Sequence, residues 1–280
     1  MLFAGCAQQH LTRRSGFKLV FSAFCAQYAR AGESDLARGI PQRPADAFTG
    51  SQFAEAVSGM SREEREIAIL EQLVQGNVPQ FLRKLVPVTL NSATVFVMPE
   101  YLAIGSDGDF LRIPMNFHTA MEIARRFGFI LPTKKIVDAI YNQSASRFAP
   151  QPLPAGPEMT STKYYRMHNA MIDAQSRTRG FAKDALVAGH KKDVVLTNRL
   201  TRIAGRIAIY GWHRAPGMPI QPLSTVHEAN YADYSHGIRL VASTALVDGK
   251  AKPTHEILEN PTLSSTLSDE GAIAISSISA

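Results

Sequence analysis

Four of the seven histidines that follow residue 31 lie within one stretch of 47 residues. Imidazole titrates near neutral pH and is also a common zinc ligand, so clustered histidines can transfer protons or hold a metal ion. Each of the four stands at the end of an expected strand or in an adjoining loop, where the catalytic residues of many enzymes lie. The four residues are His190, His213, His227 and His236.

One interpretation of this cluster is a hydrolase, exported from the cell, that acts on a cell-wall or polysaccharide polymer. In it, one divalent metal ion such as zinc activates a water molecule. The expected ligands are His213, His227 and His236. The chain contains no His-Glu-x-x-His sequence, so the spacing alone does not identify a metal site.

A second interpretation is a polysaccharide lyase that needs no metal. A histidine acts as general base or acid with a tyrosine as its partner, while basic side chains neutralise an anionic substrate. For an enzyme of either kind, the expected catalytic residues are His190, His213, His227, Tyr234, His236 and Arg239. The expected substrate-binding residues are Lys191, Lys192, Trp212 and Tyr231. A serine hydrolase is disfavoured because Ser235 and His236 are adjacent, and adjacent strand residues point to opposite faces.

A third interpretation is a module that binds carbohydrate or peptide without catalysis. Tyr210, Trp212, Tyr231 and Tyr234 would then form an aromatic face, since aromatic rings supply apolar area with a polar group at the edge. The histidines would only donate or accept hydrogen bonds.

The N-terminal segment has the three parts of an export signal. Arg13 and Arg14 precede an apolar run at residues 19–26, and Ala29-Arg30-Ala31 supplies small residues for cleavage. The paired arginines resemble the twin-arginine export signal. We expect cleavage after Ala31 and a periplasmic or extracellular protein whose substrate, polymeric or small, lies outside the cytoplasm. The alternatives are an amphipathic first helix, and a lipoprotein signal at residues 2–6.

Removal of residues 1–31 changes the charge and the cysteine content of the chain. The number of basic residues falls from 30 to 26 against 24 acidic residues, so the net charge falls from +6 to +2. The remaining charge gives no reason to expect a nucleic-acid partner. The two cysteines, Cys6 and Cys25, are lost as well, which excludes a cysteine nucleophile. The apolar runs are shorter than the ~18 residues of a membrane span.

The first half of the chain, residues 32–150, has mainly helical patterns. A helix is expected at 62–75 after the capping box Ser61-Arg62-Glu63-Glu64, and two more begin near Thr119 and after Thr133. A β-hairpin is expected from residues 94–104 and 110–115, around Asp107-Gly108.

The second half, residues 151–280, begins after a proline-rich connector at 149–157. It is expected to contain a helix at 160–178, strands at 186–197, 206–212 and 237–247, and a stiff proline-rich loop at 214–223. These patterns predict an α+β fold, in which a helix-rich N-terminal half packs on a mainly antiparallel sheet in the C-terminal half as one compact domain.

Overall fold

The computed structural model describes residues 36–180, 182 and 184–278, so the predicted export signal lies outside the described residues. The helices are α2 (Gly50–Ala56), α3 (Arg62–Val74), α4 (Phe117–Phe127), α5 (Lys134–Gln143), α6 (Thr162–Arg179) and α7 (Thr254–Glu259). The strands of the first half are β1 (Val86–Leu90), β2 (Ala93–Val97), β3 (Ala103–Gly105), β4 (Phe110–Arg112), β5 (Phe129–Ile130) and β6 (Ser146–Arg147). The strands of the second half are β7 (Val187–Ala188), β8 (Lys192–Val194), β9 (Ile209–Ala215), β10 (Met218–Ser224), β11 (His236–Gly237), β12 (Val241–Ala242), β13 (Thr244–Val247) and β14 (Lys250–Pro253). Short 3-10 turns occur at Gln80–Arg83, Pro157–Thr160, Ser264–Thr266 and Ile275–Ser277.

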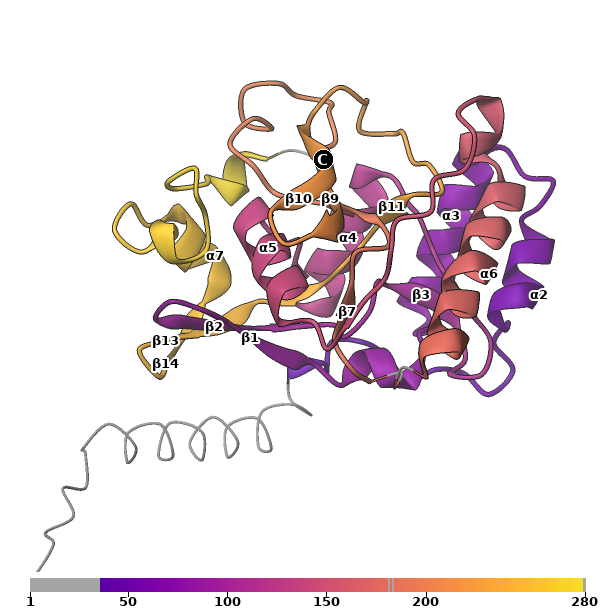
Figure 1. Ribbon diagram of the computed structural model, residues 1–280, viewed down its shortest axis with the longest axis horizontal. Helices are drawn as coiled ribbons and strands as arrows, with labels where there is room; N and C mark the ends of the chain where they lie inside the picture. Colours follow the sequence, from indigo (N-terminus) through magenta and orange to yellow (C-terminus); the bar gives the residue numbers. More distant parts are fainter. Residues whose placement is uncertain (1–35, 181, 183, 279–280) are drawn as a thin grey trace, which may run out of the picture.

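Two sheets organise the fold. The larger has the order β14-β13-β2-β12-β5, with β1 paired to β2, and it therefore combines strands from both halves of the chain. The smaller has the order β10-β9-β8-β11, in which β11 pairs with β8 in parallel and the other pairs are antiparallel. In Figure 1, helices α2, α3 and α6 lie at the right of the molecule, and strands β13 and β14 with α7 lie at the left.

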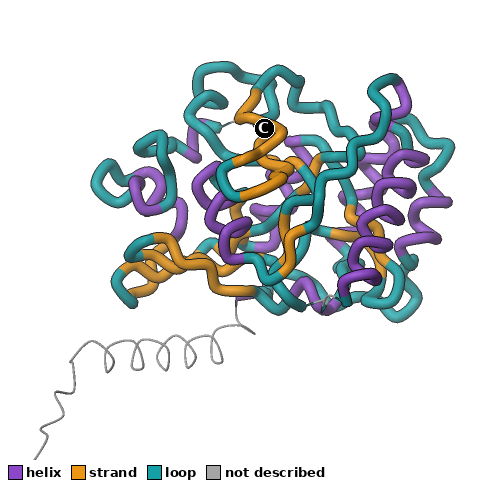
Figure 2. Tube along the Cα trace, viewed as in Figure 1, coloured by secondary structure: helices purple, strands orange, loops and turns teal. Residues whose placement is uncertain are grey.

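The predicted α+β class is confirmed, but the predicted division into a helical N-terminal half and a sheet in the C-terminal half is wrong. Figure 2 shows helices on both sides of the strands, and the longest helix within the described residues, α6, belongs to the second half. The larger sheet needs β1, β2 and β5 from the first half, because β12 and β13 pair with β2. A pattern local in sequence does not reveal such distant pairing.

Several helix ends lie where the capping residues predict, although α4 begins at Phe117, after the cap Asn116, and not at Thr119. Ser61 and Glu64 form the capping box of α3, and the Thr133 side chain accepts a hydrogen bond from the first turn of α5. Gly128 and Gly180 end α4 and α6 in the left-handed conformation that glycine adopts most readily.

Four strand predictions need correction. The expected strand at 186–197 is divided into β7 and β8, and that at 237–247 into β11, β12 and β13, which belong to different sheets. The expected first hairpin strand at 94–104 is divided, since β2 pairs with β1 and only β3 pairs with β4 around Asp107-Gly108. The proline-rich segment at 214–223 is not a loop, because most of it forms strand β10 at the edge of the smaller sheet. Proline is tolerated there because an edge strand leaves some of its N–H positions without a ladder partner.

The smaller sheet brings two distant segments together. His236 lies opposite Lys192 and Gly237 opposite Asp193 in the parallel pair of β11 and β8. Gly237 is required at this point, since a Cβ atom there would lie 2.6 Å from the ring of Tyr101. Polar residues 190–193 and 233–236 thereby meet in the interior of the protein.

Candidate functional site

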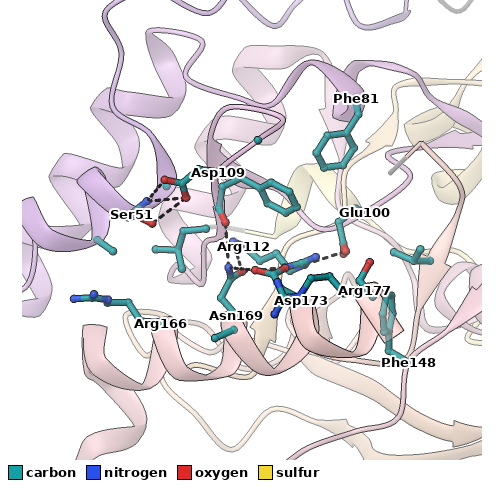
Figure 3. A pocket seen from close by; sticks show the side chains of 18 of the residues that line it. Ser51, Phe81, Glu100, Asp109, Arg112, Phe148, Arg166, Asn169, Asp173 and Arg177 are labelled. Carbon is teal, nitrogen blue, oxygen red and sulfur yellow. Dashed lines mark hydrogen bonds and ion pairs between the residues drawn. The ribbon is translucent and has the colours of Figure 1, made fainter. Parts of the chain in front are cut away.

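A cavity of about 550 Å³ opens between the start of α2, the β3–β4 hairpin and one face of α6 (Figure 3). This volume lies within the range of sites that bind small molecules. Helix α6 contributes Arg166, Asn169, Asp173 and Arg177, whose spacing of three or four residues places them on one face. We call this space the Glu100 cavity, after the carboxylate in its wall.

A row of planar polar groups crosses the wall of the Glu100 cavity. Arg112 donates from Nε to Glu100 Oε2 at 2.9 Å and from Nη1 to Asp173 Oδ1 at 2.8 Å. Nη1 also lies 3.0 Å from Asn169 Oδ1 (Figure 3). The Arg112 side chain is only 4% exposed, whereas that of Asp173 is 33% exposed. The row is therefore fixed in place before any ligand arrives, and part of it faces the cavity.

Among the described residues, the charges that line the Glu100 cavity balance. Three are carboxylates and three are guanidinium groups: Glu100, Asp109, Asp173, Arg112, Arg166 and Arg177. Burial alone would raise the pKa of Glu100, but the hydrogen bond from His190 and the attraction of Arg112 outweigh it and hold that pKa well below its ordinary value. Glu100 is thus a permanent carboxylate.

Phenyl rings form an apolar part of the same lining. The ring centres of Phe81 and Phe110 lie 5.2 Å apart, and the guanidinium of Arg112 lies 4.8 Å from the centre of the Phe110 ring. Phe148 adds a third ring. The cavity therefore offers flat apolar surface next to charged and amide groups.

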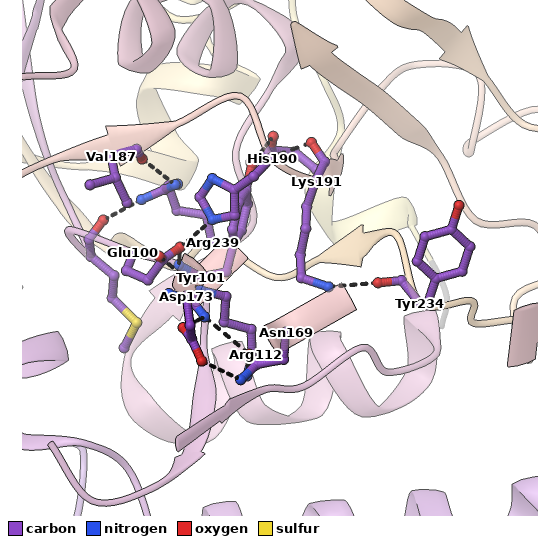
Figure 4. Close-up of polar contacts among 12 residues, drawn as sticks. Glu100, Tyr101, Arg112, Asn169, Asp173, Val187, His190, Lys191, Tyr234 and Arg239 are labelled. Carbon is purple, nitrogen blue, oxygen red and sulfur yellow. Dashed lines mark hydrogen bonds and ion pairs between the residues drawn. The ribbon is translucent and has the colours of Figure 1, made fainter. Parts of the chain in front are cut away.

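His190 and Lys191 are buried on the protein side of this wall (Figure 4). His190 Nε2 lies 2.7 Å from Glu100 Oε1. Burial lowers the pKa of His190, so the neutral ring donates from Nε2 to the carboxylate and leaves Nδ1 as an acceptor with no partner among the described residues. Lys191 donates to the carbonyl oxygen of Tyr234 at 2.6 Å, and burial together with repulsion from Arg112 lowers its pKa to about 7.

A second polar cluster lies where β8 meets β11, and we call it the Asp233 group. Its members are Lys192, Tyr231, Asp233 and His236. Lys192 Nζ and His236 Nε2 each lie 3.9 Å from Asp233 Oδ2, and the Tyr231 hydroxyl donates to the same oxygen at 3.3 Å. Burial lowers the pKa of His236 to about 4. The His227 ring stacks on Tyr231 at 4.3 Å.

The structure therefore brings together many of the residues predicted from sequence. Lys192, Tyr231 and His236 belong to the Asp233 group, with His227 beside them. Lys191 and His190 lie behind the wall of the Glu100 cavity.

His213 lies in a different place. Its Nε2 atom is 3.0 Å from Asp138 Oδ1, which also accepts from the Tyr210 hydroxyl, and its ring stacks on Tyr141. Lys134 pairs with the other oxygen of Asp138.

The expected set of metal ligands is not assembled. His213 is separate from His227 and His236, whose ring centres are 6.4 Å apart. Among residues 36–278 as described, no group of three or more His, Cys, Asp or Glu side chains is arranged to hold a metal ion. The residues present do not fit the zinc site that the sequence predicted.

The remaining predicted site residues are buried. Both Nη atoms of Arg239 donate to backbone carbonyls, of Met98 and Val187, and its guanidinium lies 4.4 Å from the centre of the Tyr101 ring. Trp212 is 4% and Tyr234 2% exposed, so neither contributes to an exposed aromatic face.

Several residues of the site were not predicted. The stripe of Asn169, Asp173 and Arg177 on α6 was visible in the sequence, since it repeats every four residues opposite the apolar stripe. Glu100 and Arg112 carry no such signal. They meet only because the β3–β4 hairpin folds back toward the end of β2.

Comparisons with known proteins return no match at any of three levels: protein families, curated proteins and solved structures. Among the described residues, no helix is both long and apolar enough to cross a membrane.

Proposed function

We propose that the protein binds a saccharide segment of a polysaccharide or cell-wall polymer in the Glu100 cavity. The observation that carries this proposal is the fixed row of Glu100, Arg112, Asn169 and Asp173 beside three phenyl rings. Sugar hydroxyls both donate and accept hydrogen bonds, and the C–H face of a sugar ring packs on aromatic surface. The cavity offers both kinds of contact side by side.

The charge balance favours a neutral ligand. A nucleotide or a phosphate would need an excess of cationic groups, whereas the three guanidinium groups here are matched by three carboxylates. Arg112, moreover, is already engaged by Glu100 and Asp173. A neutral saccharide can accept from the guanidinium groups and donate to the carboxylates without leaving a buried charge unpaired.

Calorimetric titration with soluble oligosaccharides from cell-wall glycans tests this proposal. We expect Asp173→Ala to weaken binding by about tenfold, as expected for a lost hydrogen bond to a charged group. Asp184→Ala is the matched control, because Asp184 pairs with Lys84 and does not line the cavity. No binding by the wild-type protein, or equal binding by both variants, would contradict the proposal.

Hydrolysis of the bound polymer is a second candidate function. The observation that favours it is the position of two buried bases, His190 with its free Nδ1 atom and Lys191 with a pKa of about 7, behind the cavity wall. Ionisable groups with perturbed pKa values cluster at catalytic sites. Release of reducing ends from a glycan, lost in Lys191→Met with saccharide binding retained, is the expected result. If the wild type binds the saccharide but releases no reducing ends, hydrolysis is rejected and saccharide binding without catalysis remains.

Export is proposed from the sequence of residues 1–31. N-terminal sequencing of the protein produced in a bacterial host with a twin-arginine system should show Gly32 as the first residue. An intact N-terminus in the cytoplasm would contradict this.

A further inference from the structure

Two polar contacts within the Asp233 group are too long to be direct hydrogen bonds. Asp233 Oδ2 lies 3.9 Å from Lys192 Nζ and 3.9 Å from His236 Nε2. Polar atoms at this separation are commonly bridged by a water molecule that lies about 2.8 Å from each. Both ring nitrogens of His236, which is completely buried, lack a hydrogen-bond partner within the described chain. An unsatisfied buried polar atom is costly, so the ring requires a partner.

We propose that Lys192, Asp233 and His236 hold one water molecule and activate it to hydrolyse an ester. The water would donate one hydrogen to Asp233 Oδ2 and the other to His236 Nε2, and it would accept from Lys192 Nζ. Its remaining lone pair is free to attack. This proposal does not depend on the Glu100 cavity or on saccharide binding.

The charges of the Asp233 group suit a general base. Burial lowers the pKa of His236 to about 4, with Asp233 opposing this effect and Lys192, His227 and Lys191 adding to it. The imidazole is therefore neutral at neutral pH and can accept a proton. Burial would raise the pKa of Asp233, but the attraction of Lys192 and the hydrogen bonds from Ser235 act against it and lower that pKa, so the carboxylate stays ionised.

The reaction balances without a co-reactant. The water oxygen bonds to the acyl carbon as its proton passes to His236 Nε2, and the ammonium of Lys192 stabilises the negative charge on the acyl oxygen. The tetrahedral intermediate then breaks its bond to the alcohol oxygen, which takes the proton back from the imidazolium. The products are a carboxylic acid and an alcohol.

An ester suits this group better than a glycoside does. Cleavage of a glycoside requires an acid that protonates the leaving oxygen, and within the Asp233 group the carboxyl is ionised and the imidazole is neutral. A substrate would have to reach the group from the side of Lys192, whose side chain is 12% exposed, and of the stacked pair of His227 and Tyr231, because these are its half-buried members and neighbours.

Hydrolysis of p-nitrophenyl acetate by the full chain, measured from pH 3.5 to 8, tests the proposal. We expect a saturable rate that is constant near neutral pH and falls in acid with a midpoint near 4, because protonated His236 is no longer a base. An exposed histidine that reacts non-specifically would instead titrate near its ordinary pKa of about 6.5. A midpoint near that value would overturn the proposal.

Substitutions within and outside the Asp233 group test whether the ester is hydrolysed there. His236→Gln should reduce the saturable rate by about 100-fold, the usual contribution of a general base. His255→Gln is the control, because His255 is exposed on α7. If His236→Gln does not fold, as judged by circular dichroism, Lys192→Met provides the same test at a half-buried position and should lower the rate by about tenfold.

Equal rates in the wild type and in a folded His236→Gln or Lys192→Met variant would overturn the proposal. Saccharide titration of the same samples keeps the two proposals apart, since neither substitution touches the Glu100 cavity.

Discussion

Glu100 and His190 form a hydrogen bond of 2.7 Å between side chains that are at most 5% exposed. The second oxygen of the same carboxylate accepts from Arg112, so one buried group satisfies both a histidine from the second half of the chain and an arginine from the first. This contact joins the wall of the Glu100 cavity to the segment that leads into β8. A substitution at Glu100 should therefore lower both the stability of the protein and its affinity for the ligand.

Replacing Glu100 by glutamine should strongly destabilise the protein. The substitution keeps the shape but removes the charge, which leaves the buried Arg112 with Asp173 as its one remaining anionic partner among the described residues. Removing one member of a buried ion pair typically costs about 3–5 kcal/mol. Urea unfolding followed by circular dichroism measures the loss. Glu122→Gln is the control, since Glu122 pairs only with Arg125 and Arg126 on the surface of α4, and its unfolding midpoint should not change.

The cluster around His213 should contribute to stability and not to ligand binding. Asp138 accepts from the Tyr210 hydroxyl at 2.7 Å and contacts His213 Nε2 at 3.0 Å, away from both the Glu100 cavity and the Asp233 group. We expect Asp138→Ala to lower the free energy of unfolding by about 1–3 kcal/mol, because it leaves buried polar atoms unsatisfied.

Saccharide titration and the ester assay on the folded Asp138→Ala variant check the other half of this prediction. Both should match the wild type. If the folded variant loses saccharide binding or ester hydrolysis, the cluster around His213 has a functional role after all.

The sequence predicted local structure and the residue types of the site better than their arrangement. Capping residues such as Ser61 and Thr133 act within one helical turn, so the helix starts could be predicted. The pairing of β2 with β12 and β13 joins residues about 150 positions apart, and the sequence of a strand does not indicate which distant strand pairs with it. The histidine-rich stretch was predicted to form one site, and its division among three clusters depends on contacts with distant segments: Glu100 for His190, Asp138 of α5 for His213, and β8 for His236.

Two site residues illustrate the same limit. His213 and His236 looked equivalent in sequence, since each is flanked by aromatic residues and by a nearby glycine. In the structure His213 meets Asp138 from α5, whereas His236 faces Asp233 and lies opposite Lys192 in β8. Their different roles follow from the acidic partner that the fold supplies, which spacing along the chain could not reveal.

Glu66 should make stability depend on pH. Its carboxylate accepts from the backbone N–H of Asn116 and from the Thr119 hydroxyl at the start of α4, and burial raises its pKa to about 7. Because the pKa of Glu66 is raised in the folded state, its contribution to the free energy of unfolding is complete below the unfolded pKa near 4.5 and is lost as the pH rises through about 7.

We therefore expect the urea midpoint of the wild type to fall between pH 5.5 and pH 8 by more than that of Glu66→Gln, in which the side chain cannot ionise. Glu63→Gln, an exposed change on the same helix, should keep the wild-type dependence. Identical pH dependence in Glu66→Gln and the wild type would show that Glu66 ionises alike in the folded and unfolded chain.

Gly237 should tolerate no side chain. A Cβ atom at this position would lie 2.6 and 2.7 Å from two atoms of the Tyr101 ring and 2.9 Å from Lys191 Cβ. Neither neighbour can move easily, because the Tyr101 hydroxyl donates to Asp193 at 2.8 Å and the guanidinium of Arg239 lies against the ring. Gly237→Ala should therefore cost about 1–3 kcal/mol or more through overpacking. Gly59→Ala, where no atom lies within 4 Å of the added carbon, should cost nothing comparable. Thermal unfolding of the two variants beside the wild type measures the difference, and equal midpoints would mean that β8 and β11 can separate enough to admit a methyl group.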